Sequence, residues 1–328
     1  MPDLKKSSYI FSFNNKQKSF LKGALVFFIP VIAIYVLLEV LVLQLPFNYI
    51  NISEHLVSEG KNIKILTTGS SQMKCAVNPR FFDQEAINFG STSQHHNTDY
   101  NIITQTKDRL ENLDVVVLEL SYSHLELPHN SKFFWKNTIY LKYYQVNNFE
   151  RKTYFKDKFI FLSRPDIYAK AFINYYIKHE GITEYNRFGF NEDNFAGIFQ
   201  KSNYEDDKIP TESSELNTSE SVYLFEKNTK FLYKILDYLS DNNINVVLTS
   251  LPMHRYYLRG RNPNILRRRD SILELVLENY KNVRAFRKEE DTIHFKTSDY
   301  INHNHLNPRG AEKFTKELNT FIEEQFPN

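Results

Sequence analysis

Cysteine is almost absent from this sequence of 328 residues, which contains only Cys75. A single cysteine excludes an intramolecular disulfide framework and argues against a cysteine-based metal site. Glycine is also scarce, with 9 residues, and the sequence has no glycine-rich nucleotide-binding loop. The net charge of only +2 at pH 7 argues against a dedicated nucleic-acid-binding protein.

Apolar residues are plentiful, at 41% of the sequence, so a sizeable core can form in one large domain or two smaller ones. The longest apolar run covers residues 23–45 and is interrupted only by Glu39 and Gln44. Its length matches the roughly 20 residues that cross a bilayer. No small-residue cleavage site follows it, so we expect an uncleaved transmembrane anchor. Glu39 is expected either to reach the membrane interface or to face a partner helix.

Lysine is concentrated before this apolar run, where five lysines stand against one acidic residue, Asp3. Positive residues favour the cytoplasmic side of a membrane. We therefore expect residues 1–22 to form a cytoplasmic tail, residues 46–62 a juxtamembrane spacer and residues 63–328 an extracytoplasmic domain. The prediction is a single-pass protein of the inner (cytoplasmic) membrane with its C-terminal domain in the periplasm.

Short apolar segments alternate with helical segments after residue 63. Strands are expected at residues 63–68, from Ala86, and at 113–120, 244–250 and 283–286. Alternation at this spacing predicts βαβ units, and hence an α/β fold with a parallel sheet flanked by helices. An aromatic-rich stretch from about residue 130 to 221 interrupts the pattern. We interpret it as a mostly helical insertion.

The first expected strand ends in Gly69-Ser70-Ser71. Glycine suits a tight turn from strand to helix, and a serine on such a turn lies at the edge where open α/β sheets bind ligands. The start of a helix also favours developing negative charge. By itself the tripeptide is more often a helix N-cap than a catalytic motif, so its meaning depends on the other end of the chain.

That end contains Asp299-Tyr300-Ile301-Asn302-His303-Asn304-His305-Leu306-Asn307-Pro308-Arg309-Gly310-Ala311. Here the sequence resembles the SGNH/GDSL superfamily of esterases and acyltransferases, which ends in Asp-x-x-His-Leu and a Gly-Ala or Gly-His pair before a terminal helix. Gly69-Ser70-Ser71 matches the family's Gly-Asp-Ser block, with Ser70 in place of aspartate. The resemblance covers about residues 63–326 and implies a flavodoxin-like three-layer fold.

The resemblance implies a catalytic pair. Ser71 is the expected nucleophile and His305 the base that takes its proton and later returns it. Asn302 stands where the family has the aspartate that orients the histidine. An asparagine can orient an imidazole but cannot stabilise an imidazolium by charge, so Asp299, three residues earlier, is the other candidate for this role.

Two further blocks imply oxyanion-binding groups. Asn88-Phe89-Gly90-Ser91-Thr92-Ser93 resembles the second block, so Gly90 and Ser93 are candidates, with Ser93 where the family has an oxyanion-hole glycine. Ser121-Tyr122-Ser123-His124 aligns with the third block, where Ser123 replaces an asparagine. A serine hydroxyl can donate but reaches less far, and the loss of one donor typically costs roughly 3 kcal/mol of transition-state stabilisation.

Other histidines do not indicate a metal site in the sequence. His303 and His305 lie close together, but carboxylates at ligand spacing are absent. His95 and His96 are interpreted as polar loop residues. We therefore expect no metal ion and no cofactor.

The resemblance implies a membrane-anchored serine O-acyl esterase or O-acyltransferase that modifies an extracytoplasmic glycan or another cell-envelope polymer. One anchor followed by such a domain also resembles the partners of membrane-bound O-acyltransferases, which makes such an enzyme an expected partner. The alternative is a non-catalytic binding or recruitment module of the cell envelope, favoured by the substitutions at Ser70, Ser123 and Asn302. Six arginines between residues 255 and 269 form either a solvated face or a surface for anionic polymers or lipids.

Overall fold

The computed structural model describes residues 14–129, 135–180, 183–213 and 216–327. The chain divides into two compact units, which are described separately. Among described residues, the smaller unit contains 14–45 and 154–180, and the larger unit contains the remainder. Residues 1–13 of the expected cytoplasmic tail lie outside the described residues.

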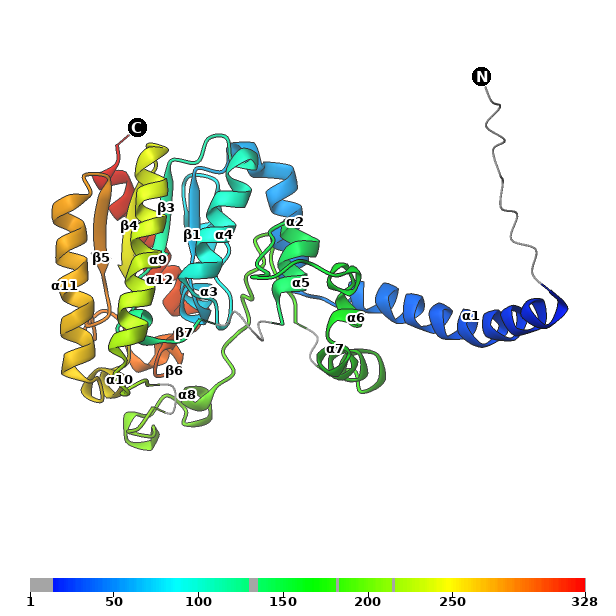
Figure 1. The fold of residues 1–328 in the computed structure, drawn as a ribbon. Helices are drawn as coiled ribbons and strands as arrows, with labels where there is room; N and C mark the ends of the chain where they lie inside the picture. The colour runs from blue at the N-terminus through cyan, green and yellow to red at the C-terminus, as the bar shows by residue number, and fades with distance from the viewer. Residues whose placement is uncertain (1–13, 130–134, 181–182, 214–215, 328) are drawn as a thin grey trace, which may run out of the picture. The chain divides into compact units, whose positions relative to one another are not determined.

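The larger unit contains a five-stranded sheet of β1 (Ile65–Thr68), β2 (Ala86–Asn88), β3 (Val115–Glu119), β4 (Asn245–Ser250) and β5 (Val283–Arg287). Its order is β2-β1-β3-β4-β5 and every neighbouring pair is parallel (Figure 1). The predicted α/β fold with a parallel sheet is therefore confirmed. β1 and β3 are buried along their whole length, as expected for apolar strands covered on both faces. This strand order is that of flavodoxin-like sheets.

The strand register brings the carboxyl ends of the strands to one edge. Leu66 pairs with Val116, Val116 with Val246, and Val246 with Val283. Thr68 in β1 is level with Leu118 in β3. The turns that follow β1, β2 and β3 consequently leave the same edge, which is where ligands bind to open parallel sheets.

Helices flank the sheet (Figure 1). Right-handed crossovers put α3 (Ser71–Ala76) on the face opposite to α4 (His96–Thr106), α9 (Val222–Asp241) and α11 (Pro263–Asn279). The terminal helix α12 (Pro308–Gln325) packs against α3, and α4 packs against α9. The core on the α3 side is formed by buried apolar side chains, among them Ile65, Met73, Val117, Val247, Phe286, Phe314 and Leu318.

A short antiparallel ribbon carries the end block of the sequence. It consists of β6 (Tyr300–Asn302) and β7 (His305–Leu306), and β7 leads through Asn307 into α12. The Asn307 side chain accepts hydrogen bonds from the N–H groups of Arg309 and Gly310, and so caps α12. β7 packs beside α3, which brings the end block next to the turn after β1.

The stretch expected to be a juxtamembrane spacer, residues 46–62, is part of the packed larger unit. It forms α2 (Asn48–Glu59) and a 3-10 turn (Gly60–Asn62). Tyr49, Ile52 and Leu56 are buried, at the spacing of one helix face. Residues 46–62 are thus a packed helix and turn and not a spacer, because the polar residues between these three positions conceal the apolar face in the sequence.

The aromatic-rich insertion contains short helices, but irregular segments such as 145–153 and 183–197 make up more of its described part, so the prediction of a mostly helical insertion was wrong. The insertion is shared between the two units. In the larger unit it forms α5 (Asn137–Ile139), a π-helical turn (Tyr140–Tyr144), a 3-10 turn (Asp206–Lys208) and α8 (Ile198–Lys201). In the smaller unit it forms a 3-10 turn (Phe155–Lys158), α6 (Ile160–Ser163), α7 (Pro165–Phe172) and a second π-helical turn (Ile173–Ile177). Phe133 and Phe134 lie outside the described residues.

The smaller unit is built on α1 (Asn15–Leu43), a helix of 29 residues. By length and composition α1 can cross a membrane, with a mean hydropathy of 2.8 over 18 residues, and it is the one such helix in the described ranges. It begins before the predicted residue 23, because a capping box between Asn14 and Gln17 fixes its start.

Glu39 has a partner within the smaller unit that neither sequence-based alternative included. Its carboxylate accepts hydrogen bonds from the backbone N–H groups of Ile160, at 2.6 Å, and Phe161, at 2.8 Å. These are the first two residues of α6, whose N–H groups have no acceptor inside the helix. Glu39 therefore caps a short helix of its own chain.

Candidate active site

The turn after β1 requires glycine at position 69. Gly69 has φ = +153°, and a Cβ there would lie 2.6 Å from both Cβ and Oε2 of Glu119. Ser70 is the N-cap of α3, and its hydroxyl oxygen accepts a hydrogen bond from the N–H of Gln72. Ser71 is the first residue of α3. The local sequence thus places the Ser71 side chain at the carboxyl edge of the sheet.

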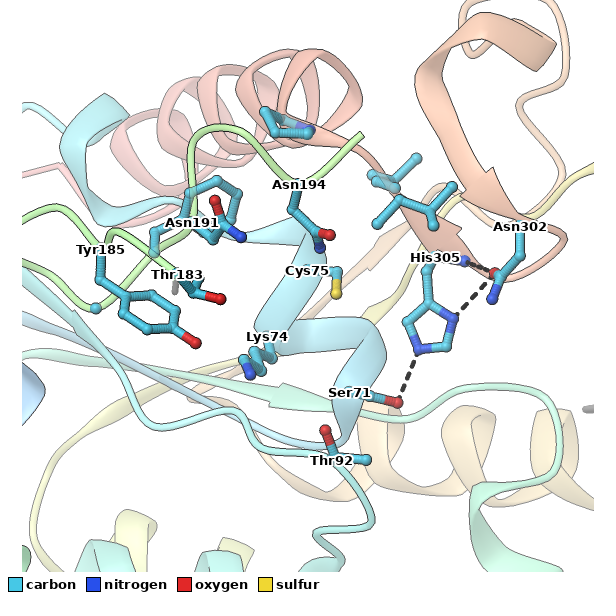
Figure 2. Close-up of a pocket in the computed structure, with 15 residues that line it drawn as sticks. Ser71, Lys74, Cys75, Thr92, Thr183, Tyr185, Asn191, Asn194, Asn302 and His305 are labelled. Atoms are coloured by element: carbon cyan, nitrogen blue, oxygen red, sulfur yellow. Dashed lines mark hydrogen bonds between the residues drawn. The ribbon is translucent and has the colours of Figure 1, made fainter. Parts of the chain in front are cut away.

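Ser71, His305 and Asn302 form a hydrogen-bonded chain, which Figure 2 shows. Ser71 Oγ lies 2.8 Å from His305 Nε2, and His305 Nδ1 lies 3.0 Å from Asn302 Oδ1. Ser71 is far from His305 and Asn302 in the sequence, and it meets them where α3 packs beside β7. The structure therefore brings together the predicted nucleophile, the predicted base and one of the two candidates for orienting the base.

The asparagine fixes which nitrogen of His305 carries the proton. Asn302 Oδ1 also accepts hydrogen bonds from the backbone N–H of His305, at 2.9 Å, and of Asn304, at 3.1 Å. With the carboxamide oxygen held in this way, His305 Nδ1–H is the donor toward Asn302. Nε2 then has a lone pair for the Ser71 hydroxyl proton, which is the arrangement that a serine–histidine pair requires.

Asp299 lies in a different set of contacts. Its buried carboxylate accepts hydrogen bonds from Arg309 Nε at 3.0 Å, Lys313 Nζ at 2.7 Å and the backbone N–H of Lys296 at 2.9 Å. It thereby links the end block to the first turns of α12. Of the two candidates, only Asn302 has a hydrogen bond to the His305 ring in the described structure.

A buried carboxylate supports the turn that carries the serine. Glu119, the last residue of β3, accepts hydrogen bonds from the N–H of Ser70 at 2.6 Å, the Ser70 hydroxyl at 3.0 Å and the Ser121 hydroxyl at 2.7 Å. Burial raises its pKa, but the hydrogen bonds and charge interaction from His124 and the Ser121 and Ser70 donors outweigh burial and leave the pKa below the ordinary value. Ser70, where the family has aspartate, therefore connects the turn to Glu119.

The Ser71–His305 pair opens into a cavity of about 600 Å³ (Figure 2). Its polar lining consists of hydroxyl, amide and ammonium groups, contributed by Lys74, Thr92, Thr183, Tyr185, Asn191 and Asn194 in addition to the three residues above. Cys75, half-buried on α3, also lines it. No aspartate or glutamate is among these described lining residues, so the cavity suits neutral or anionic ligands.

The three predicted oxyanion-binding residues do not line this cavity. The Gly90 N–H donates to the Asn88 side chain at 2.8 Å. A Cβ at Gly90 would lie 2.7 Å from the Lys74 backbone nitrogen, so the glycine allows close packing against α3. Ser93 is exposed with φ = +62°, and Ser123 is buried.

Thr92, which the sequence reasoning missed, lies beside Ser71 in the cavity lining (Figure 2). Lys136 holds its loop by donating hydrogen bonds to the Thr92 carbonyl at 2.7 Å and to the Ser91 hydroxyl at 2.8 Å. Burial, assisted by the charge of Lys74, lowers the pKa of Lys136 well below its ordinary value. Thr92 adjoins Ser93 in the second block, but no sequence signal indicated Lys136, inside the aromatic insertion.

The remaining histidines of the carboxyl edge are buried. His303 Nε2 is 2.7 Å from the carbonyl oxygen of Pro210, so His303 does not share the hydrogen-bond partners of His305. His95 is the N-cap of α4 and His96 its first residue, and both are buried together with His124. His95 therefore lies in the loop before α4, as interpreted, whereas the interpretation of His96 as a loop residue was wrong. One nitrogen from each of these three rings lies within 4.8 Å of the other two.

The arginines between residues 255 and 269 are largely paired. Four have carboxylate partners: Arg255 with Asp206, Arg261 with Glu290, Arg268 with Glu126 and Arg269 with Glu289. Arg269 is 1% exposed. These contacts make a network inside the chain and leave little of the cluster's charge for an anionic polymer or lipid.

Comparison with known proteins adds no relative to this geometry: neither the family models nor the curated proteins that were searched gave a match to the chain.

Proposed function

We propose that this protein is a membrane-anchored, SGNH-like serine O-acyl esterase or O-acyltransferase. The observation that carries the proposal is the hydrogen-bonded chain from Ser71 Oγ to His305 Nε2 and from His305 Nδ1 to Asn302 Oδ1, at the edge of a cavity. A hydroxyl, a neutral imidazole and an acceptor that orients the imidazole are the parts of a serine nucleophile system.

In the proposed reaction, Ser71 Oγ attacks the carbonyl carbon of an acyl ester while His305 Nε2 takes the hydroxyl proton. The tetrahedral intermediate collapses, His305 returns the proton to the leaving alcohol, and the acyl group stays on Ser71. A water molecule or an acceptor hydroxyl then attacks this ester by the reverse sequence. Asn302 keeps the imidazole in the productive tautomer but adds no negative charge beside the imidazolium.

The developing oxyanion needs donors near Ser71. We assign this role to the Ser71 N–H, which at the first position of α3 has no intrahelical acceptor, and to Thr92, which lines the cavity beside it. This replaces the donors that the family resemblance suggested, because none of Gly90, Ser93 and Ser123 lines the cavity.

The proposed acceptor is an extracytoplasmic glycan or another hydroxyl-rich envelope polymer. The cavity offers amide groups from Asn191 and Asn194, hydroxyls from Thr183 and Tyr185, and the apolar side chain of Phe190. Such a lining can hydrogen-bond sugar hydroxyls and pack against a sugar ring. α1 would hold the larger unit at the periplasmic side of the inner membrane, where a membrane-bound O-acyltransferase is the proposed acyl donor.

A fluorophosphonate probe tests the nucleophile. The full chain, purified in detergent, should be labelled on Ser71, and labelling should disappear in Ser71→Ala while a matched control, Ser163→Ala, keeps it. Ser163 lies in α6 of the smaller unit. Absence of labelling in the wild type, together with no turnover of simple acyl esters, would favour the non-catalytic binding module.

The compartment has its own test. A reporter that is active only in the cytoplasm, fused after Asn328, should be silent if the larger unit is periplasmic. A reporter that is active only in the periplasm should be active at the same position. The reverse pattern would contradict the proposed orientation without affecting the proposed chemistry.

A further inference from the structure

Three buried histidines from two distant segments meet at the carboxyl edge of the sheet. His95 and His96 come from the start of α4, and His124 follows β3. One ring nitrogen from each lies within 4.8 Å of the other two, and the side chains are at most 4% exposed. A fourth imidazole, His129, has its ring centroid 4.4 Å from that of His95. We call His95, His96 and His124 the buried histidine cluster.

Two members of the cluster have an unused lone pair directed into the interior. His96 Nε2–H donates to the Glu119 carbonyl at 3.0 Å, which leaves the lone pair on Nδ1. His124 Nδ1 faces the Glu119 carboxylate at 3.6 Å, which favours a proton there and leaves the lone pair on Nε2. His96 Nδ1 and His124 Nε2 are both buried without a hydrogen-bond partner among the described residues. Buried acceptors that remain unpaired are costly.

Metal-binding histidines commonly have this arrangement. The nitrogen that does not bind the metal donates to a backbone carbonyl or a carboxylate, which fixes the tautomer and the ring orientation. Glu119 provides both kinds of partner, its carbonyl to His96 and its carboxylate to His124. One residue therefore orients two potential ligands at once.

The local charge also favours a cation. Two carboxylates lie at the cluster, Glu119 and Asp99, with exposed fractions of 1% and 0%. His124 interacts electrostatically with both. Within the ranges that the structure describes, neither carboxylate has a lysine or arginine at ion-pair distance. A divalent ion bound at the cluster would add positive charge beside both buried carboxylates.

We propose that the buried histidine cluster binds one divalent transition-metal ion, with zinc as the best fit. His96 Nδ1 and His124 Nε2 are the first two ligands and His95 is the third. His95 now donates to the His124 carbonyl at 2.7 Å and accepts from the His96 N–H at 2.8 Å, so it joins by exchanging one of these hydrogen bonds for the metal. Imidazole donors suit zinc, copper, iron and nickel better than magnesium or calcium.

The proposed role of the metal is structural. Glu119 orients the two ligands and also holds Ser70, the residue before the proposed nucleophile. An ion bound to the cluster would therefore stiffen the turn that carries Ser71 without taking part in acyl transfer. The metal proposal rests on the cluster alone and stands independently of the proposed function.

The test measures metal binding by the full chain in detergent, purified with a tag that contains no histidine and stripped with EDTA. Elemental analysis after dialysis against Zn²⁺ should give about one zinc per chain. Zinc should raise the apparent Tm by roughly 5 °C, reversibly with EDTA. X-ray absorption of the zinc-loaded wild type should show histidine nitrogens as the main ligands.

Two variants remove the ligand atoms while keeping the hydrogen bonds to Glu119. In His96→Gln the amide takes the place of Nε2 and Nδ1 is lost; in His124→Asn the amide takes the place of Nδ1 and Nε2 is lost. Each should reduce zinc stoichiometry from about one to near zero. His294→Asn is the matched control, because His294 is exposed and pairs with Glu317.

Equal zinc binding in the wild type and both cluster variants would overturn the proposal, as would its loss in His294→Asn. Less than about a tenth of an equivalent of zinc on the wild type would do the same, whether or not the variants fold. An X-ray absorption spectrum dominated by oxygen ligands would place the ion elsewhere and would also overturn it.

Discussion

His305 and the buried histidine cluster both lie at the carboxyl edge of one sheet, but they differ in almost every physical respect. His305 is partly exposed, adjoins a 600 Å³ cavity and has both ring nitrogens hydrogen-bonded, one to Ser71 and one to Asn302. In the buried histidine cluster, two ring nitrogens have no hydrogen-bond partner among described residues, and none of the three rings lines the cavity beside Ser71.

The difference separates two kinds of chemistry. A proton acceptor for an incoming substrate must be accessible and correctly oriented, as His305 is. A ligand for a structural metal must be buried and oriented by a hydrogen-bond partner on its other nitrogen, as His96 and His124 are by Glu119. Glu119 joins the two regions because its carboxylate contacts both the serine turn and His124. Each prediction below tests one side of this comparison.

The largest effect is expected at the open site, which is the Ser71–His305 pair beside the cavity. Ser71→Ala and His305→Ala should each lower kcat/KM for a simple acetyl ester by about 10⁴-fold or more, and the double variant should cost about the same as either one. The residues act as one unit, so removing one makes the other useless. Steady-state kinetics with circular dichroism as a folding control checks this. Additive losses would contradict a shared proton transfer.

Asn302 should have the next largest effect. Asn302→Ala should lower kcat/KM by about 10²- to 10⁴-fold, since the imidazole loses the group that fixes its tautomer. Asn302→Asp should preserve or raise activity because a carboxylate also stabilises the imidazolium. Asp299→Asn is the matched comparison and should weaken the start of α12 more than catalysis, because Asp299 contacts Arg309 and Lys313. A reversed ranking would make Asp299 the orienting residue.

At the buried histidine cluster, the prediction concerns the free energy of unfolding. Burial raises the pKa of Asp99 to about 6, against the lowering influence of hydrogen bonds from Thr68 and Gln94. A raised folded-state pKa gives stability that is present below the unfolded value of 3.8 and is lost as pH rises through about 6. In metal-free protein this loss should be on the order of 2 to 3 kcal/mol between pH 4 and pH 8.

Asp99→Asn isolates that contribution. Urea unfolding of the wild type and the variant, each with EDTA, gives the difference in stability at each pH. The difference in free energy of unfolding should shift in favour of the variant as pH rises from 5 to 7.5, whatever its value at a single pH. A stability difference that does not change with pH would show that Asp99 does not titrate in this range and would contradict the raised pKa.

The sequence predicted that Ser71 and His305 meet, because the signals for these two residues are local, but its three oxyanion candidates do not line the cavity. The strand ending in Gly69-Ser70-Ser71 and the block from Asp299 to Ala311 each lie within a few residues, and the parallel sheet that joins them follows from alternating apolar segments. Predicting which of Asn302 and Asp299 contacts His305 needed three-dimensional information, because a difference of three residues does not determine side-chain direction in a tight ribbon.

The buried histidine cluster also could not be predicted without three-dimensional information. His95 and His96 are 28 or more residues from His124, and no spacing rule connects them. Their meeting depends on the register of β1, β2 and β3, and their burial depends on α4 packing against α9. The packing of residues 46–62 was missed because the apolar residues of α2 are diluted by polar ones.

The smallest effect is expected at Ser123. Its substitution tests whether the turn after β3 belongs to the Ser71–His305 site or to the buried histidine cluster. The family resemblance assigns Ser123 to the oxyanion hole, and the loss of a donor there costs about 10²- to 10³-fold in kcat. In the structure Ser123 is 6% exposed, lies outside the cavity lining and is followed directly by His124 of the buried cluster. Ser123→Ala should therefore leave kcat/KM within about twofold, whereas Thr92→Gly, which loosens the loop beside Ser71, should lower it more. A loss of 10²-fold or more in a folded Ser123→Ala variant would restore the oxyanion role that the family resemblance implies and would make the turn after β3 part of the open site.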